Sequence, residues 1–246
     1  LNEAFPEIKP VEVILLSRNS HETGQRVFRS ISHYNLGIHK AAFFRGESPH
    51  KYIPAFGASL FLSANEDDVR NAINAGFPAG RVVKTEIKDE ENDKTLRIAF
   101  DFDGVAIGDE AEQVYDKEGL LGFYFSEMAN SEKTHNPGPI NNFVKQLMAL
   151  RGMESEKEKQ DQNYQRILDL AFITARDAPA HERMINTIKS WGGEIDKSFF
   201  LGGTPKKNIL EILSPHIYFD DQERHFDDVH NIPLVHIPFG IRNVKK

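Results

Sequence analysis

Several residue types and patterns are missing or scarce, and each absence excludes a class of protein. The chain has no cysteine, which excludes disulfide bonds, thiolate catalysis and zinc–thiolate sites. No apolar run approaches the roughly 20 residues that a membrane-spanning helix needs, and no signal peptide is recognisable, so we expect no membrane partner. Basic residues are outnumbered, because 30 Lys and Arg face 37 Asp and Glu for a net charge of −7. Such a chain lacks the basic face that binding to a nucleic-acid polymer requires.

What the sequence does contain is an ordinary balance for a folded protein. It has 246 residues, of which 39% are hydrophobic and 27% are charged, close to the average for globular chains. Domains usually span about 100–200 residues, so the length predicts one large domain or two small ones. The acidic net charge does not exclude a small anionic substrate, since a local site can be cationic within an acidic protein.

Short apolar runs alternate with segments of helical periodicity along the chain. This alternation predicts an α/β fold with a parallel sheet covered by helices on both faces. The charged segments 86–94 and 154–165 are interpreted as solvated, the first as a linker or hairpin. The expected strands are 11–16, 41–44, 59–62, 81–84, 96–100, 167–173, 198–201, 216–219 and 233–237, and the expected helices are 23–34, 65–75, 109–150 with an interruption at 136–139, and 179–191.

The pattern of the first part of the chain returns in the second part. Phe43-Phe-Arg-Gly-Glu-Ser-Pro49 corresponds to Phe199-Phe-Leu-Gly-Gly-Thr-Pro205, and such self-similarity indicates a duplicated unit, although any two α/β units share some features. We therefore expect a degenerate α/β repeat at 1–90 and a catalytic core at 95–246, with a helical insertion at about 106–165. The acids Asp220-Asp221 of the second copy correspond to Ser63-Ala64 of the first, which places the chemistry in the second copy.

Two carboxylates directly follow the expected strand 96–100. Asp101 and Asp103 are separated by one residue, so the alternation of an extended chain points both side chains to the same side. Ligands of parallel α/β sheets bind outside the carboxyl ends of the strands, and two adjacent carboxylates repel unless a cation or proton lies between them. The pair therefore predicts a Mg²⁺ site. The alternative is a helix-capping aspartate beside a turn aspartate.

Three further elements lie at expected strand ends or helix starts. Thr174 ends a strand, where a hydroxyl and nearby backbone N–H groups can hold a phosphate oxygen, although threonine also caps helices. Lys206, or its neighbour Lys207, starts a helix, where a cation opposes the helix dipole and a bound anion would offset it. A solvated surface lysine is the alternative. Asp220 and Asp221 follow another strand and indicate metal ligands, with a solvated turn as the alternative.

In this order along the chain, the four elements resemble the four motifs of the haloacid dehalogenase (HAD) superfamily of phosphatases and phosphotransferases. Three strings are similar to those of the cytosolic 5′-nucleotidase class I family: Arg97-Ile-Ala-Phe-Asp-Phe-Asp-Gly-Val-Ala-Ile-Gly-Asp-Glu-Ala-Glu112, Tyr218-Phe-Asp-Asp-Gln222 and Gly46-Glu-Ser-Pro49. The resemblance implies a HAD-like Rossmannoid sheet, a small helical cap in the insertion, and a cytoplasmic enzyme that hydrolyses nucleoside 5′-monophosphates. Members of that family are longer at the N-terminus, which implies that the first strand of the degenerate repeat precedes Leu1.

The resemblance also implies roles for individual residues. Asp101 would attack the phosphorus to form an aspartyl-phosphate, and Asp103 would act as general acid and then general base. Mg²⁺ would bind Asp101, the backbone carbonyl of Asp103, and the Asp220-Asp221 pair, with Asp221 as a direct ligand and Asp220 either a direct ligand or a residue that stands behind the ligands. For Arg176, a charge placed behind the phosphate-binding residues or a direct phosphate contact is expected, and a salt bridge to Asp177 or another acid is the alternative. The residues that would contact the phosphate are Thr174, Ala175, Arg176 and Lys206.

Aromatic and histidine side chains are the least informative candidates. The resemblance implies that a base stacks on an aromatic residue of the cap, and packing inside the cap is the alternative for each candidate. His225 and His230 lack a third partner at metal-ligand spacing, so we interpret them as surface or hydrogen-bonded histidines. The aromatic candidates are Tyr115, Phe123, Tyr124 and Phe125.

Two other hypotheses fit the same residues. A HAD phosphatase for another small ester, such as a sugar phosphate, would carry the same acids and bases. A catalytically idle nucleotide-binding or regulatory module would resemble the first repeat. For the first repeat itself, packing against the second repeat, extension of the core and formation of a homo-oligomer interface are the alternatives.

Overall fold

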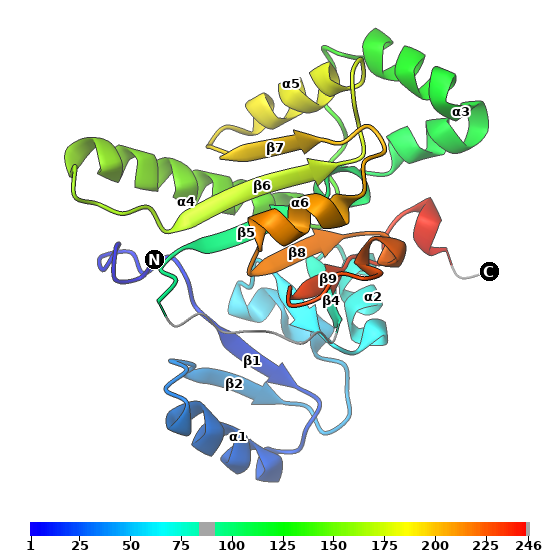
Figure 1. Cartoon of the computed structure of the whole chain (residues 1–246). Helices are drawn as coiled ribbons and strands as arrows, with labels where there is room; N and C mark the ends of the chain where they lie inside the picture. The colour runs from blue at the N-terminus through cyan, green and yellow to red at the C-terminus, as the bar shows by residue number, and fades with distance from the viewer. Residues whose placement is uncertain (84–91, 245–246) are drawn as a thin grey trace.

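The computed structural model describes residues 1–83 and 92–244, and most of its strands form one sheet of seven (Figure 1). β4 and β9 are antiparallel, whereas the other neighbouring pairs of this sheet are parallel. The expectation of a wholly parallel sheet is therefore wrong at this junction, because an apolar run indicates that a strand is buried but not its direction. In order across the sheet, the strands are β3 (Phe61–Ser63), β4 (Ala79–Val83), β9 (Leu234–His236), β8 (Ile217–Asp220), β5 (Leu96–Phe100), β6 (Leu168–Thr174) and β7 (Lys197–Phe200).

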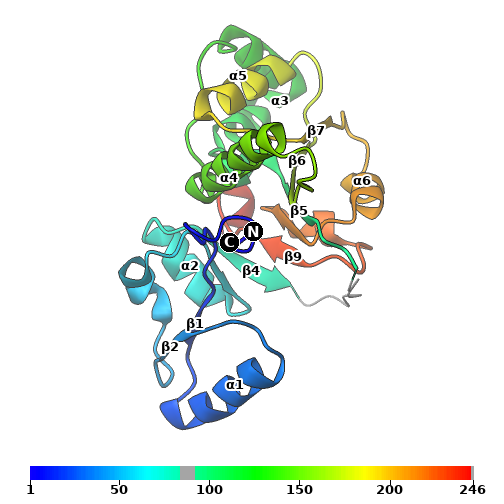
Figure 2. The same cartoon turned by 90° about the vertical axis from the view of Figure 1, so that its left-hand side faces the viewer.

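Helices cover both faces of the sheet, as expected. Ile98 and Phe100 of β5 pack with residues of α4 (Asn141–Gln160) and α5 (His181–Trp191). The intervening Ala99 packs on the opposite face, in the same core as Leu210 of α6 (Lys206–Leu213). Figure 2 shows α4 and α6 on opposite sides of β5 and β6. Strands buried on both faces are apolar at successive positions, which explains the continuous runs in the sequence.

Two long helices fill the stretch between β5 and β6. α3 (Glu110–Ala129) packs against α5, and α4 packs against β6. The interruption expected at 136–139 is confirmed, since α3 ends before it and α4 begins after it. Figure 1 shows α3 past the carboxyl ends of β6 and β7, so this helix can form a wall over the end of the sheet. None of the described helices is both long enough and apolar enough to span a membrane.

The charged segment 154–165 is not solvated along its length. α4 continues to Gln160, and the side chain of Glu154 is fully buried. Its carboxylate accepts the backbone N–H groups of Ile167 at 2.8 Å and Leu168 at 2.9 Å, and the O–H of Tyr164 at 2.6 Å. The interpretation as a solvated segment is therefore wrong at Glu154, where neighbouring segments supply donors to a buried carboxylate, but it is confirmed for residues 159–163, which are exposed.

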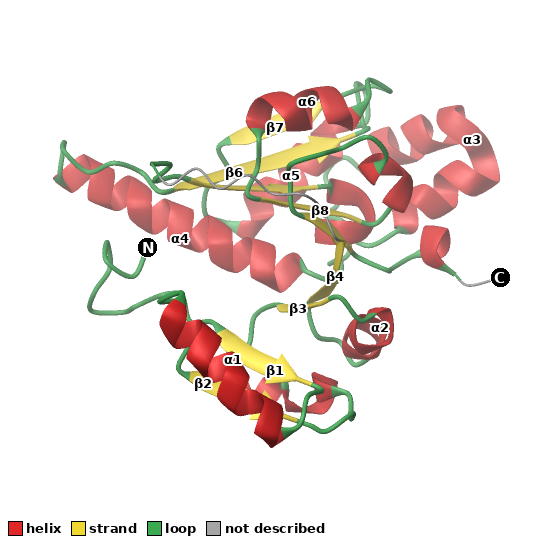
Figure 3. Cartoon of the chain, turned by 60° about the horizontal axis from the view of Figure 1, so that its bottom comes forward, coloured by secondary structure: helices red, strands yellow, loops and turns green. Residues whose placement is uncertain are grey.

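The first part of the chain is divided between two sheets. β1 (Ile14–Ser17) and β2 (Lys40–Phe43) form a separate parallel pair, and Figure 3 shows α1 (His21–His33) lying along it. β3 and β4, with α2 (Glu66–Asn74) packed on them, extend the large sheet instead.

The strands of the two predicted repeats, 1–90 and 95–246, are arranged differently. In the second predicted repeat, β5 lies between β8 and β6 within one sheet. In the first, β3 and β1 belong to different sheets, and no strand of the described residues lies between them. A first strand ahead of Leu1, and the division into two domains, stay predictions. Most of the expected linker or hairpin 86–94 lies outside the described residues.

Candidate active site

Three neighbouring strands end in polar residues at one edge of the sheet. β5 lies between β6 and β8 and is parallel to both, so the carboxyl ends of the three strands lie side by side. Asp101 follows β5, Thr174 ends β6 and Asp220 ends β8. All three side chains are buried. The structure thus brings together three residues that the sequence singled out.

The carboxylate of Asp101 is held at both oxygens. Oδ1 accepts the backbone N–H of Phe102 at 2.7 Å, and Oδ2 lies 2.6 Å from Nζ of Lys206. Burial raises the pKa of Asp101 to about 7, although the ammonium of Lys206 opposes the rise. Asp101 lines the pocket described below, so a poorly hydrated carboxylate faces the space that a ligand can enter.

Lys206 is the first residue of α6 and bridges two acids. Its Nζ lies 2.6 Å from Asp101 and 2.8 Å from Asp220, and its side chain is 5% exposed. Burial lowers its pKa, but the two carboxylates outweigh burial, so the pKa of Lys206 is raised and the ammonium stays charged. Lys207 is 39% exposed and its Nζ lies 3.8 Å from Glu211. The structure therefore places Lys206, and not Lys207, in the site.

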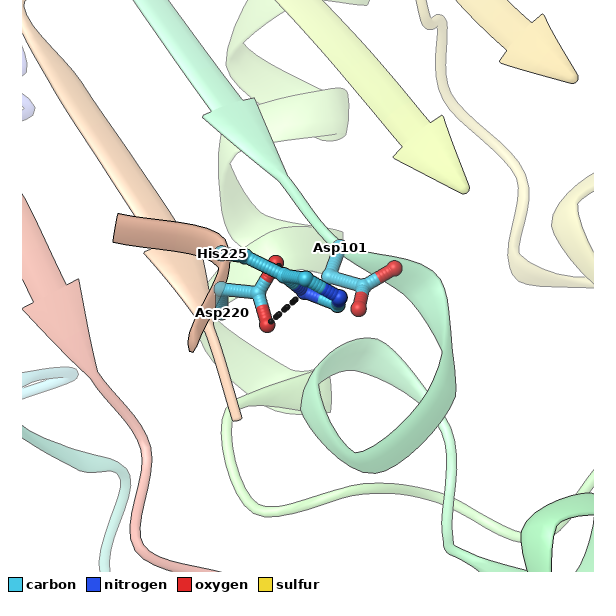
Figure 4. A group of neighbouring side chains, drawn as sticks. All are labelled: Asp101, Asp220 and His225. Carbon is cyan, nitrogen blue, oxygen red and sulfur yellow. Dashed lines mark hydrogen bonds and ion pairs between the residues drawn. The ribbon is translucent and has the colours of Figure 1, made fainter. Parts of the chain in front are cut away.

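Asp220 is surrounded by donors. Its Oδ1 accepts the backbone N–H of Gln222 at 2.8 Å, and its Oδ2 lies 2.9 Å from Nδ1 of His225 (Figure 4). The O–H of Tyr218 also donates to Oδ2. Burial alone would raise the pKa of Asp220, but the charges and hydrogen bonds of Lys206 and His225 lower it. Asp220 is therefore ionised at neutral pH.

Asp221 has the opposite surroundings. Neither of its carboxylate oxygens accepts a hydrogen bond from the described residues. The carboxylate packs against the turn after Asp101, since a Cβ built on Gly104 (φ +70°) would lie 2.7 Å from Oδ2 of Asp221. Burial and the charges of Asp220 and Asp101 raise the pKa of Asp221 to about 10. A buried carboxylate without donors costs free energy until a proton or a cation neutralises it.

These acids fit a divalent cation. Asp101, Asp220 and His225 each offer a ligand atom, and the three atoms lie within 4.8 Å of one another (Figure 4). Asp101 and Asp220 share the ammonium of Lys206, while Asp221 has no donor among the described residues. When all three aspartates are ionised, their negative charge exceeds what the single ammonium of Lys206 offsets, and a bound cation would balance the remainder. Carboxylate oxygens suit Mg²⁺, and an imidazole also suits other divalent ions.

His225 is a site residue that the sequence reasoning missed. It lies in the short 3₁₀ helix Glu223–Phe226 directly after β8, and it lines the pocket. Its hydrogen bond to Asp220 agrees with the interpretation as a hydrogen-bonded histidine, but its place in a group that could hold a metal ion was not expected. The signal was its position one short turn after the paired acids. His230 is exposed.

Asp103 turns its carboxylate to Arg176. Nε of Arg176 donates to Oδ2 at 2.8 Å, and Nη2 donates to Oδ1 at 2.7 Å. The guanidinium is buried and has Glu127 as a second acidic partner. Arg176 therefore forms the salt bridge that was the alternative to a phosphate contact, and its partners are Asp103 and Glu127 rather than Asp177. Both Asp103 and Arg176 line the pocket.

Thr174 and Ala175 lie next to these acids in the wall of the pocket. Oγ1 of Thr174 accepts the backbone N–H of Arg176 at 3.2 Å. A hydroxyl that accepts one bond can still donate its own hydrogen, so Thr174 is able to bind an anionic oxygen in the pocket.

A pocket of about 580 Å³ opens over this group of residues, a size typical of small-molecule sites. α3 contributes Tyr115, Phe123 and Tyr124 to its wall, and the O–H of Tyr124 donates to Asp177 at 2.7 Å. Phe125 is 66% exposed and is not part of the wall, because each residue of an α-helix is turned by about 100° from the one before it. Three of the four aromatic candidates therefore face the site.

The chain matches a family model and a curated human protein. The family model described as 5′-nucleotidase matches residues 1–244. Human cytosolic 5′-nucleotidase 1B is 29% identical over 231 residues, which are 92% of this chain and 37% of that protein. The chain thus spans little more than a third of the relative's length. No solved structure gives a match. Because the family model covers nearly every residue, the chain belongs to the 5′-nucleotidase family.

Proposed function

We propose that the chain is a Mg²⁺-dependent 5′-nucleotidase that converts nucleoside 5′-monophosphates to nucleoside and phosphate. The observation that carries the proposal is the buried group in which Asp101 lies 2.6 Å from Lys206 while Asp221 has no donor among the described residues. Such a group fits a phosphoryl group together with a cation. The family match and the name of the human relative favour a nucleotide as the phosphate ester.

Asp101 is the proposed nucleophile. One of its carboxylate oxygens would form a bond to phosphorus as the bond from phosphorus to the ribose O5′ breaks. Asp103 would give a proton to the departing O5′ and later take one from the water that attacks the aspartyl-phosphate. The second attack would release inorganic phosphate and restore both carboxyl groups. Both residues line the same pocket, which supports their action on one phosphoryl group.

The other phosphate oxygens would be held by neighbouring residues of the same wall. The hydroxyl of Thr174, the backbone of Ala175 and the ammonium of Lys206 are the proposed donors. Arg176 would contribute through Asp103, because its guanidinium is engaged with that carboxylate.

The proposed metal ligands are Asp101, Asp220, Asp221 and the backbone carbonyl of Asp103. When bound, Mg²⁺ supplies positive charge that offsets the charge of the phosphoryl oxygens. The carboxylate of Asp221 accepts no hydrogen bond from the described part of the chain, which supports a cation at this place, and His225 belongs to the same group.

Base recognition would come from the aromatic wall of α3. Tyr115, Phe123 and Tyr124 line the pocket, and aromatic faces stack on any nucleobase. A cytoplasmic location, which the name of the human relative also suggests, and a homo-oligomer stay predictions.

Phosphate release from nucleoside 5′-monophosphates and from sugar phosphates, measured with Mg²⁺ and with EDTA, tests this function. We expect release from nucleotides with Mg²⁺ and none with EDTA. Release from sugar phosphates alone would keep the phosphatase chemistry and reject the nucleotidase. If no ester is hydrolysed, the enzyme proposal fails, and calorimetric titration with a nucleoside monophosphate would then show whether the pocket binds nucleotides.

A further inference from the structure

We propose that Glu127 of α3 is a positioning residue that acts on Asp103 through Arg176. The inference rests on the proposed role of Asp103 as general acid and base. Glu127 lies in the helical stretch between β5 and β6, its side chain is 1% exposed, and it is not part of the pocket wall. Its part in the reaction is therefore indirect.

Arg176 links the two acids. Its Nε and Nη2 donate to the carboxylate of Asp103 at 2.8 and 2.7 Å, and its Nη1 donates to Oε2 of Glu127. A guanidinium is planar, so its donors point in directions that are fixed relative to one another. Because Glu127 holds one end of this plane, it sets the orientation of the other end, which holds Asp103.

Glu127 is itself fixed from the opposite side. Its Oε1 accepts a hydrogen bond from Nη1 of Arg183 on α5 at 2.8 Å, and its Oε2 lies 3.2 Å from Nε2 of His135. Burial would raise its pKa, but His135 and Arg176 outweigh burial and lower the pKa of Glu127 to about 2. Glu127 is thus an ionised anchor that connects α3, α5 and the site.

The guanidinium has few other supports. It lies 5.5 Å from the ring centroid of Phe102 and 5.3 Å from that of Phe123, contacts that are attractive but permit rotation in the plane of the rings. Without Glu127, Nη1 of Arg176 would retain only its hydrogen bond to the backbone carbonyl of Ala180, at 3.3 Å, among the described residues. Removal of the Glu127 charge is therefore expected to loosen Arg176 and, with it, Asp103.

Displacement of the general acid slows a reaction most when its leaving group must receive a proton. Without a proton, the nucleoside would have to leave as a strongly basic alkoxide. In contrast, p-nitrophenol leaves readily as the weakly basic p-nitrophenolate anion. In single turnovers, which isolate attack by Asp101, we expect Glu127→Gln to slow the nucleotide reaction by about 10- to 100-fold and the p-nitrophenyl phosphate reaction by less than about threefold.

Two controls separate positioning from a general loss of structure. Glu110→Gln removes another carboxylate of α3, one that contacts His135 at 3.2 Å and the backbone of Asn136 at 2.8 Å; it should slow both substrates equally or not at all. Glu127→Gln should add no further loss in the Asp103→Asn background, because the residue on which it acts is already disabled. Equal losses on both substrates, or a further loss in that background, would overturn the proposal.

A spectroscopic measurement decides the point without turnover. The Nε–H of Arg176 donates to Asp103 and should give a slowly exchanging NMR signal in the wild type and in Glu110→Gln, but not in Glu127→Gln. An unchanged signal in Glu127→Gln would overturn the proposal. If the wild type hydrolyses neither substrate, the proposed function fails while this signal still reports on positioning. Should Glu127→Gln fail to fold, Glu127→Asp retains the charge on a shorter side chain and permits the same comparison.

Discussion

The two predicted repeats, 1–90 and 95–246, contain the same turn with different charges around it. In each, a glycine with positive φ donates its backbone N–H to the carbonyl of an arginine: Gly46 to Arg18 at 2.7 Å, and Gly202 to Arg176 at 3.3 Å. Arg18 then forms two hydrogen bonds with one buried acid, Asp68, at 2.8 and 2.6 Å. Arg176 is divided between two acids from different elements.

The buried acids of the two regions differ further, and Asp68 lies in α2 rather than at a strand end. Ser63-Ala64 of the first repeat corresponds to Asp220-Asp221 of the second. Burial opposes the ionisation of Asp68, but Arg18 outweighs it and the pKa of Asp68 is lowered, whereas the pKa of Asp221 is raised to about 10 by burial and its acidic neighbours. The Arg18–Asp68 ion pair therefore stabilises the fold, whereas the strongly raised pKa of Asp221 is typical of a residue in a ligand-binding site.

The largest effect should follow from removal of the proposed nucleophile. Asp101→Asn should lower turnover by at least about 10⁴-fold, because an amide cannot form the phosphoryl intermediate. Phosphate release with Mg²⁺ measures the loss, and thermal unfolding should show an intact fold. Turnover comparable to the wild type would refute the role given to Asp101.

The second-largest loss of activity is expected at Lys206 of α6, and its exposed neighbour Lys207 serves as the control. Lys206→Ala should raise the barrier by about 3–4 kcal/mol, by analogy with the loss of one oxyanion donor, because its ammonium lies 2.6 Å from Asp101. Lys207→Ala, at an exposed position, should change kcat by less than about twofold. Similar losses in both variants would show that Lys206 has no special place in the site.

The substitution Asp221→Asn tests whether the buried carboxylate of Asp221 destabilises the metal-free protein. In the presence of EDTA the variant should melt about 2–4 °C above the wild type, the shift expected for about 1 kcal/mol in a chain of this length. Mg²⁺ should raise the melting temperature of the wild type much more than that of the variant, since at a given concentration a ligand stabilises the protein that binds it more tightly. A metal-free variant that melts below the wild type would mean that Asp221 has a stabilising partner.

The smallest effect on activity is expected in the first repeat. Asp68→Ala should cost about 1–2 kcal/mol of stability, because it removes two hydrogen bonds from a buried acid, while kcat stays unchanged. The folded-state pKa of Asp68 is lowered, so its contribution is present above the unfolded pKa and is lost as pH falls from about 5 through the folded value. Urea unfolding of both proteins between pH 7 and about pH 2 measures this. A fall in kcat would instead tie the first repeat to catalysis.

The strands that carry the site could be predicted because each is a continuous apolar run that ends in a polar residue. Parallel pairing then places Asp101, Thr174 and Asp220 at one edge without further information. The antiparallel β4–β9 junction could not be predicted, because burial pattern is the same for both directions. The burial of Glu154 was missed because its donors, the N–H groups of Ile167 and Leu168, belong to another element.

By itself, the sequence determined the local order of apolar runs, turns and acids, and hence which residues stand at the strand ends. Only the tertiary structure decided which charges meet. Arg176 takes Asp103 and Glu127 although Asp177 is its neighbour in the chain, and Asp221 is left with no donor among the described residues. The reason is physical: these partners lie on elements far apart in the sequence, so their contacts depend on how α3, α5 and α6 pack on the sheet and not on local conformational preference.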